Sequence, residues 1–86
     1  DYSGDIVQQT RETLASTDRF LAEAGSDKSK ILSVTIYLKD MARDYAGFNQ
    51  VWDAWVAPGA APARACVEAN MYKPEVLVEI TVVAAL

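Results

Sequence analysis

The feature that most constrains the fold is a repeated change of hydrophobic period along the chain. Apolar residues recur every three or four positions over residues 5–24 and, as an aromatic stripe, over residues 45–55. Residues 31–38, 62–69 and 76–84 instead alternate at every second position. The first spacing is typical of amphipathic helices and the second of strands. The predicted order is therefore helix, strand, helix, strand, strand, which makes an α+β fold.

The two predicted helices differ in how clearly their limits show. Asp5 stands at the N-cap position of the first helix, and Gly25 follows its last turn. The stretch KDMARD, residues 39–44, is predicted as a turn before the second helix. The stripe of that second helix is either a ligand platform or core packing, and its spacing favours packing. Its members are Tyr45, Phe48, Val51, Trp52 and Trp55.

Alternation within the strands predicts their faces and their pairing. One face of the first strand is predicted to hold Leu32, Val34, Ile36 and Leu38. A strand, a crossover helix and a second strand predict a parallel pair, and the last strand is expected to return antiparallel across a short loop. Three strands are few for two helices, which suggests further strands from another chain or from an upstream segment.

Length and composition limit how such a chain is stabilised. The 86 residues are predicted to form one domain, residues 1–86, and a domain of this size buries a limited share of its surface. The chain has one cysteine, Cys66, and no histidine. Neither a disulfide framework nor a cysteine-histidine metal site is therefore expected. Assembly into an oligomer is the remaining way to bury more surface.

The charge pattern argues against two classes of partner. The net charge is −4 and the basic residues are scattered, so no nucleic-acid partner is expected. No apolar run approaches the roughly 20 residues of a membrane-spanning helix, and no basic-then-apolar leader opens the sequence. We expect no membrane segment and a cytoplasmic, reducing environment. Because the sequence begins at Asp1 and not at Met, processing, truncation or an upstream segment stays open.

The segment PARACVEA, residues 62–69, places three polar side chains on one face of a strand. These are Arg64, Cys66 and Glu68. The opposite face, whose small side chains suit packing under a helix, consists of Ala63, Ala65, Val67 and Ala69. Glu79 is an isolated carboxylate in the apolar last strand. If the two strands pair, Glu79 shares a face with Arg64 or lies near Cys66.

These polar residues have alternative interpretations. In one interpretation, Arg64 and Glu79 form an ion pair at a sheet edge or subunit interface, where desolvation offsets most of their attraction. In the other, Arg64 holds a substrate carboxylate through paired hydrogen bonds. Cys66 is either a nucleophile whose pKa Arg64 lowers or a thiol that packs or lines a pocket. The absence of a histidine base favours the second role.

Two stretches of the sequence resemble a known family. PARACVEA, followed after a loop with Pro74 by VLVEITVVAAL, resembles the C-terminal signature of the Rid (YjgF) family of reactive-intermediate imine/enamine deaminases. SKILSVTIYLKDMARDYAGFNQVWDAWV is similar to that family's central strand and second helix, and VWDAWV and VVAAL resemble a branch of small Rid proteins most. The resemblance implies a chorismate-mutase-like fold, with a mixed sheet and two helices on one face. It also implies a homotrimer with sites in the clefts between subunits.

The resemblance further implies hydrolysis of 2-imino acids, released as enamines by pyridoxal-phosphate enzymes, to 2-oxo acids and ammonia, with no cofactor. Arg64 would bind the substrate carboxylate, and Glu79 and Cys66 would be catalytic, Glu79 by activating water and Cys66 by lining the pocket with its backbone near the reacting group. The alternative is a non-catalytic trimer that binds small 2-oxo acids or related carboxylates. Nuclease activity or translation inhibition, attached to relatives, is disfavoured by the acidic charge and the lack of histidine.

The sequence departs from the family pattern in two places. Family members begin with a β-hairpin that supplies a tyrosine and a small-residue segment to the site, so this domain is expected to be N-terminally incomplete, with the hairpin on a separate chain or in an upstream segment. Tyr2 precedes the first helix and is no substitute. Tyr72 and Lys73 stand where the family more often has an apolar residue and proline, which is expected to alter the pocket rim.

Overall fold

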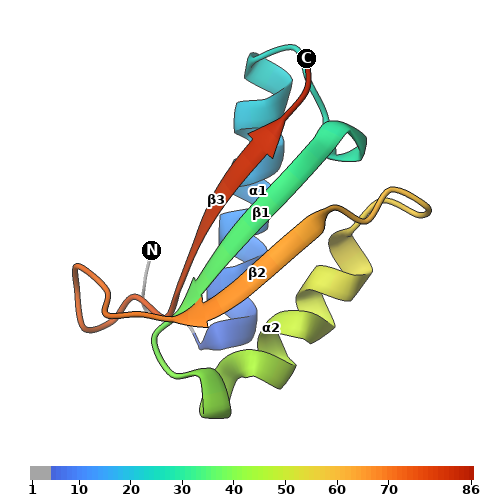
Figure 1. Cartoon of the computed structure of the whole chain (residues 1–86). Coiled ribbons are helices and arrows are strands. Elements are labelled where there is room, and N and C mark those ends of the chain that lie inside the picture. The colour runs from blue at the N-terminus through green and yellow to red at the C-terminus, as the bar shows by residue number, and fades with distance from the viewer. Residues whose placement is uncertain (1–4) are drawn as a thin grey trace.

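The computed structural model describes residues 5–86, so the prediction made for Tyr2 lies outside the described residues. Both helices lie on one face of a three-stranded mixed sheet (Figure 1). The predicted order is confirmed, with one short 3-10 helix, η1, added before the first strand. The elements are α1 (Ile6–Glu23), η1 (Lys28–Lys30), β1 (Ile31–Leu38), α2 (Met41–Trp55), β2 (Ala63–Glu68) and β3 (Val78–Ala84).

Helix α1 has the two ends that were predicted. The Asp5 carboxylate accepts a hydrogen bond from the Gln8 backbone N–H at 3.0 Å. At the other end Gly25 has φ +81°, a conformation that glycine adopts without strain. The turn through Gly25 allows the Ser26 N–H to reach the Leu21 carbonyl oxygen at 2.8 Å, so a carbonyl of the last turn keeps a partner. No helix within residues 5–86 is long and apolar enough to cross a membrane.

Helix α2 begins inside the stretch that was predicted as a turn. The Asp40 side chain accepts a hydrogen bond from the Arg43 backbone N–H at 3.0 Å, so Asp40 is the N-cap and Met41 the first helical residue. The turn prediction is therefore wrong for residues 41–44. The polar residues there belong to the first turn of a helix, where side-chain acceptors satisfy free N–H groups.

Strand β1 lies in the middle of the sheet, in the order β2-β1-β3. The predicted parallel pair is β1 with β2, and β3 is antiparallel as predicted. The partner of β3 is β1, however, so β2 and β3 do not pair and the condition for bringing Glu79 beside Arg64 fails within one chain. Because β2 and β3 lie on either side of β1, the sheet is wide enough for α1 and α2 to lie side by side over it (Figure 1).

One hydrophobic core fills the space between the helices and the sheet, and the α2 stripe contributes most of its aromatic part. The core cluster consists of Leu14, Val34, Ile36, Leu38, Phe48, Val51, Trp52 and Val78. The prediction for Leu32 is wrong, because the register shifts between Ile31 and Ser33. That irregularity turns Ile31 into the core and leaves Leu32 60% exposed.

The two faces of β2 are the reverse of the prediction. Arg64 is paired with Val34 and Cys66 with Ile36, and paired residues of neighbouring strands share a face. Arg64 and Cys66 therefore lie on the helix side of the sheet, and the small side chains face away from the helices. Because β2 is an edge strand next to α2, its polar side chains find partners on that helix, which a strand period cannot reveal.

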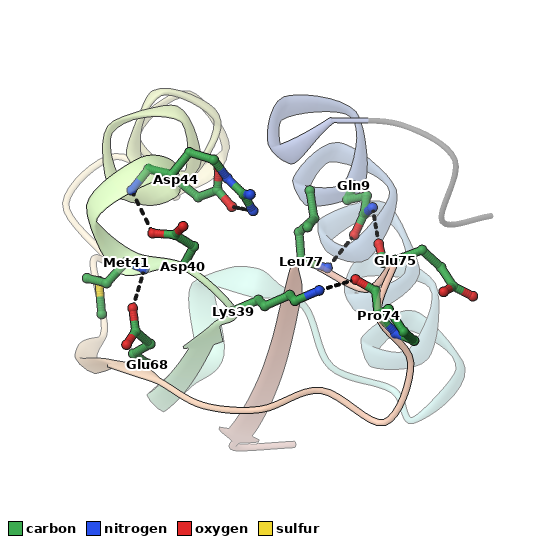
Figure 2. Close-up of polar contacts among 10 residues, drawn as sticks. Gln9, Lys39, Asp40, Met41, Asp44, Glu68, Pro74, Glu75 and Leu77 are labelled. Carbon is green, nitrogen blue, oxygen red and sulfur yellow. Dashed lines mark hydrogen bonds and ion pairs between the residues drawn. The ribbon is translucent and has the colours of Figure 1, made fainter.

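The loop between β2 and β3 is held by a buried glutamine. The Gln9 side chain donates from Nε2 to the Glu75 carbonyl oxygen and accepts from the Leu77 backbone N–H, both at 2.8 Å (Figure 2). Gln9 is 3% exposed, so water does not replace these bonds freely. Lys39 Nζ also donates to the Pro74 carbonyl oxygen.

Gln9→Ala is expected to lower the free energy of unfolding by about 2 kcal/mol, because two backbone groups lose their partner in a buried place. Gln8→Ala is the matched control. The Gln8 side chain bonds only Glu12 at an exposed position among the contacts shown by residues 5–86, so its loss should stay within about 0.5 kcal/mol. Urea denaturation of both variants measures the difference, and equal losses would contradict the buried role of Gln9.

Candidate functional site

Arg64 lies at the sheet edge with its guanidinium against α2. Its Nη2 atom donates to Asn49 Oδ1 at 2.6 Å and to the Tyr45 hydroxyl at 3.3 Å. The guanidinium carbon is 6.0, 5.8 and 5.5 Å from the ring centroids of Tyr45, Phe48 and Trp52. A guanidinium at such distances is attracted to the electron-rich faces of aromatic rings. Helix α2 thus holds this cation with neutral groups only.

An open pocket of about 570 Å³ adjoins the guanidinium. It is lined by Met41, Ala42, Tyr45, Arg64 and Cys66. Arg64 and Cys66 therefore line the same pocket, and the cation faces a hollow that a small anion can enter. Tyr72 and Lys73, expected at the pocket rim, are exposed in the β2–β3 loop and do not line this pocket within one chain.

Cys66 is half-buried in the pocket wall, with its Sγ 3.9 Å from the Met41 Sδ. Burial raises the pKa of the thiol, and the nearby Arg64 cation lowers it by less. The thiol therefore stays protonated at neutral pH. This environment favours the pocket-lining interpretation of Cys66 over the nucleophile, since the thiolate is the reactive form.

Labelling of Cys66 with iodoacetamide is expected to be slow near neutral pH. The midpoint of the labelling rate against pH, followed by mass spectrometry, should lie above the value of about 8.5 that is usual for cysteine. Arg64→Ala should move the midpoint higher still, because the cation that favours the thiolate is removed. A midpoint below about 7.5 would instead identify an activated thiol.

Glu79 does not join this pocket from the same chain. It is exposed and pairs with Tyr37 of β1, on the face turned away from the helices. Strand β1 separates it from β2, a sheet width of about 10 Å between the outer strands. An Arg64–Glu79 ion pair within one chain is therefore excluded, and so is a common face. The register of β1 decides this, because it sets which residues of both outer strands point to the helices.

Glu68 has a definite place at the entrance to α2. Its Oε1 accepts a hydrogen bond from the Met41 backbone N–H at 2.8 Å (Figure 2). That N–H group belongs to the first turn of α2, where backbone N–H groups have no partner inside the helix. Glu68 therefore connects the end of β2 to the start of α2, where Met41 and Ala42 line the pocket.

Two hydrogen-bond partners of Arg64, Asn49 and the Tyr45 hydroxyl, are not apparent from the sequence. They are four positions apart on α2 and so lie on one flank of its aromatic stripe. That spacing was the available signal, but only the crossover from α2 to β2 shows that Arg64 meets this flank. Within residues 5–86, no group of three His, Cys, Asp or Glu side chains is placed to hold a metal ion.

Comparison with known proteins gives consistent results over the whole chain. A family profile described as "Endoribonuclease L-PSP" matches residues 2–86. A RutC family protein of Haemophilus ducreyi is 48% identical over 86 residues, which is 100% of this chain and 73% of the relative.

Two solved structures show the same fold at high identity. A member of the YjgF protein family from Neisseria meningitidis is 57% identical with a TM-score of 0.90, covering 92% of this chain and 66% of that chain. An uncharacterized protein from Pseudomonas aeruginosa is 52% identical with a TM-score of 0.95, covering 99% of this chain and 73% of that chain. The predicted fold class is thereby confirmed. The chain belongs to the Rid (YjgF) family, the family of the endoribonuclease L-PSP profile.

Proposed function

We propose that this protein hydrolyses 2-imino acids to 2-oxo acids and ammonia in a cleft between subunits. The observation that carries the proposal is the guanidinium of Arg64, which faces an open pocket and has no carboxylate partner among residues 5–86. Such a cation offers charge-assisted hydrogen bonding to a small carboxylate. It orients the rest of the ligand toward Cys66 and Met41.

The chemistry requires little beyond orientation and one proton acceptor. The imine carbon is already electrophilic, so water adds to it and forms a carbon–oxygen bond. A carboxylate takes a proton from that water and passes it to the nitrogen, which gives a carbinolamine. The same carboxylate then moves the hydroxyl proton to the nitrogen as the carbon–nitrogen bond breaks, so ammonia leaves and a 2-oxo acid remains. We assign the carboxylate role to Glu79, and the backbone at Cys66 would lie beside the reacting group. Positioning and general-base catalysis are each able to supply a large part of such a rate.

Glu79 has to reach the substrate from a second chain, because it lies on the other face of the sheet from Arg64. The same outer face carries apolar side chains that one chain leaves uncovered: Val67 is 42% and Val83 55% exposed. A sheet face of this kind suits burial against another copy. We propose that this copy belongs to a homotrimer, as the family resemblance implies, and that its Glu79 completes the site.

Mixing two inactive variants tests this division of labour. Arg64→Ala and Glu79→Gln should each lose most activity alone. After unfolding together and refolding as an equal mixture, about a quarter of the clefts in a cyclic trimer combine an intact Arg64 with an intact Glu79 from the next chain, so about a quarter of the wild-type activity should return. No recovery, in mixtures that mass spectrometry shows to contain mixed trimers, would place both residues in one chain's site.

The alternative is a non-catalytic trimer that binds small 2-oxo acids. One observation favours it: the pocket of a single chain contains a cation but no proton acceptor poised near it, since the Cys66 pKa is raised and Glu79 lies elsewhere. The endoribonuclease named in the family description is a weaker candidate here. The described pocket holds one cation, and phosphodiester cleavage without a metal needs proton-transfer groups matched to neutral pH.

An imine-trapping assay separates the two candidates. An amino-acid oxidase generates the 2-imino acid, and semicarbazide traps what the protein has not hydrolysed. A deaminase lowers trapping in proportion to its concentration, and Glu79→Gln should reduce that rate by about 100-fold or more while calorimetry still shows 2-oxo acid binding. The exposed Glu23 provides the control Glu23→Gln, which should behave as wild type. Saturable binding without any effect on trapping would establish the non-catalytic alternative instead.

A further inference from the structure

The cation of the pocket is surrounded by uncharged partners although acidic residues lie close by in the sequence. Arg64 contacts the amide of Asn49, the hydroxyl and ring of Tyr45, and the rings of two further aromatic residues. The guanidinium therefore keeps its full charge for a ligand. A cation without a counter-ion is costly to bury. The hydrogen bonds from Arg64 to Asn49 and Tyr45 offset part of that cost without adding a negative charge.

The acidic side chains around the start of α2 are all engaged elsewhere. Asp40 accepts from the Arg43 backbone N–H. Asp44, which is buried, pairs with the Arg43 guanidinium at 2.8 Å. Glu68, on the same face of β2 as Arg64, accepts from the Met41 backbone N–H (Figure 2). Each of these three carboxylates thus has another partner, and none of them forms an ion pair with Arg64.

We infer that Asn49 is a positioning residue that selects anionic ligands by holding Arg64 without neutralising it. This inference rests on the proposed function, since it concerns the same pocket. The Asn49 oxygen is 2.6 Å from Nη2 and orients the planar fork. Both hydrogen bonds to α2 use Nη2, so among residues 5–86 the N–H groups at Nη1 have no protein partner and are free to donate to a ligand carboxylate.

The size and charge of the residue at position 49 can be varied separately. Asn49→Asp keeps the shape and the hydrogen bond but places a carboxylate against the cation. The ligand's carboxylate then meets a neutralised guanidinium and a like charge, so its affinity should fall by about 100-fold. Asn49→Ala keeps the full charge and only loosens the fork, so its loss should be about 10-fold.

The test measures how strongly the pocket prefers an anion to a neutral ligand of the same shape. Calorimetry is carried out with pyruvate and with its uncharged amide, on wild type, Asn49→Asp, Asn49→Ala and the control Gln50→Glu. Gln50→Glu makes the same charge change at the next, exposed position of α2 and should leave the preference unchanged. In Asn49→Asp, the ratio of the affinity for pyruvate to the affinity for its amide should fall close to one. In Asn49→Ala, most of that preference for pyruvate should remain.

The outcomes separate this inference from the proposed function. Equal losses of pyruvate affinity in Asn49→Asp and Asn49→Ala, or an unchanged preference in Asn49→Asp, would overturn the role of Asn49 in selecting anions. Thermal unfolding of the variants shows whether a loss of binding is only a loss of fold. If wild type binds pyruvate but leaves imine trapping unaffected, the deaminase proposal fails and the inference is still decided by the binding data. If wild type binds neither ligand, both fail.

Discussion

Arg64→Ala is expected to lower kcat/KM for 2-imino acids by at least about 100-fold, because the charge-assisted hydrogen bonding and the charge that hold the substrate carboxylate are lost. The same variant should lose calorimetric binding of 2-oxo acids. The kcat/KM of Arg64→Lys should lie between those of wild type and Arg64→Ala, since an ammonium keeps the charge but has no planar fork. Trapping assays measure the rate, and circular dichroism shows whether the fold persists.

The matched control for this result is Arg19→Ala. Arg19 is exposed on α1, where its side chain donates to the Ser16 hydroxyl at 2.9 Å, and it does not line the Arg64 pocket. Its removal changes the net charge by the same amount and should leave activity and binding as in wild type. Full activity in Arg64→Ala would show that the site is elsewhere, whatever the state of the control.

Leu38→Ala is expected to cost about 2–5 kcal/mol of folding free energy, because it removes a fully buried side chain and leaves a cavity. Leu38 is 0% exposed in the central strand, where it belongs to the core cluster. A domain of this size is stable by only about 5–15 kcal/mol, so the variant should be close to unfolding. Urea denaturation followed by the fluorescence of the buried Trp52 measures the loss.

Leu32→Ala is the control for the core prediction, since it makes the same change six positions earlier on the same strand. Leu32 is 60% exposed, and its loss should be below about 1 kcal/mol. Measurement at several protein concentrations separates folding from assembly. Equal losses for the two variants at every concentration would mean that β1 buries the face that simple alternation assigned to it.

Arg64 and Cys66 show how much of the site could be predicted. The strand period predicts that Arg64 and Cys66 share a face, and in the structure both line one pocket. The partners of Arg64 could not be predicted, because Asn49 lies 15 residues away in the sequence and comes close only through the crossover from α2 to β2. The separation of Glu79 from this pocket follows from strand order and register, because β1 lies between β2 and β3 and its pairing with each sets which residues face the helices.

Element type and order were determined by the sequence itself, because the repeat of side chains along a helix or a strand is a property of the local backbone. Capping by Asp5 and the turn at Gly25 are local for the same reason. The partner of β3, the face that β2 turns to the helices, and the neutral surroundings of Arg64 were decided only by the tertiary structure. They depend on contacts between segments far apart in the chain, and a single irregularity such as that near Leu32 is enough to reverse which side chain is buried.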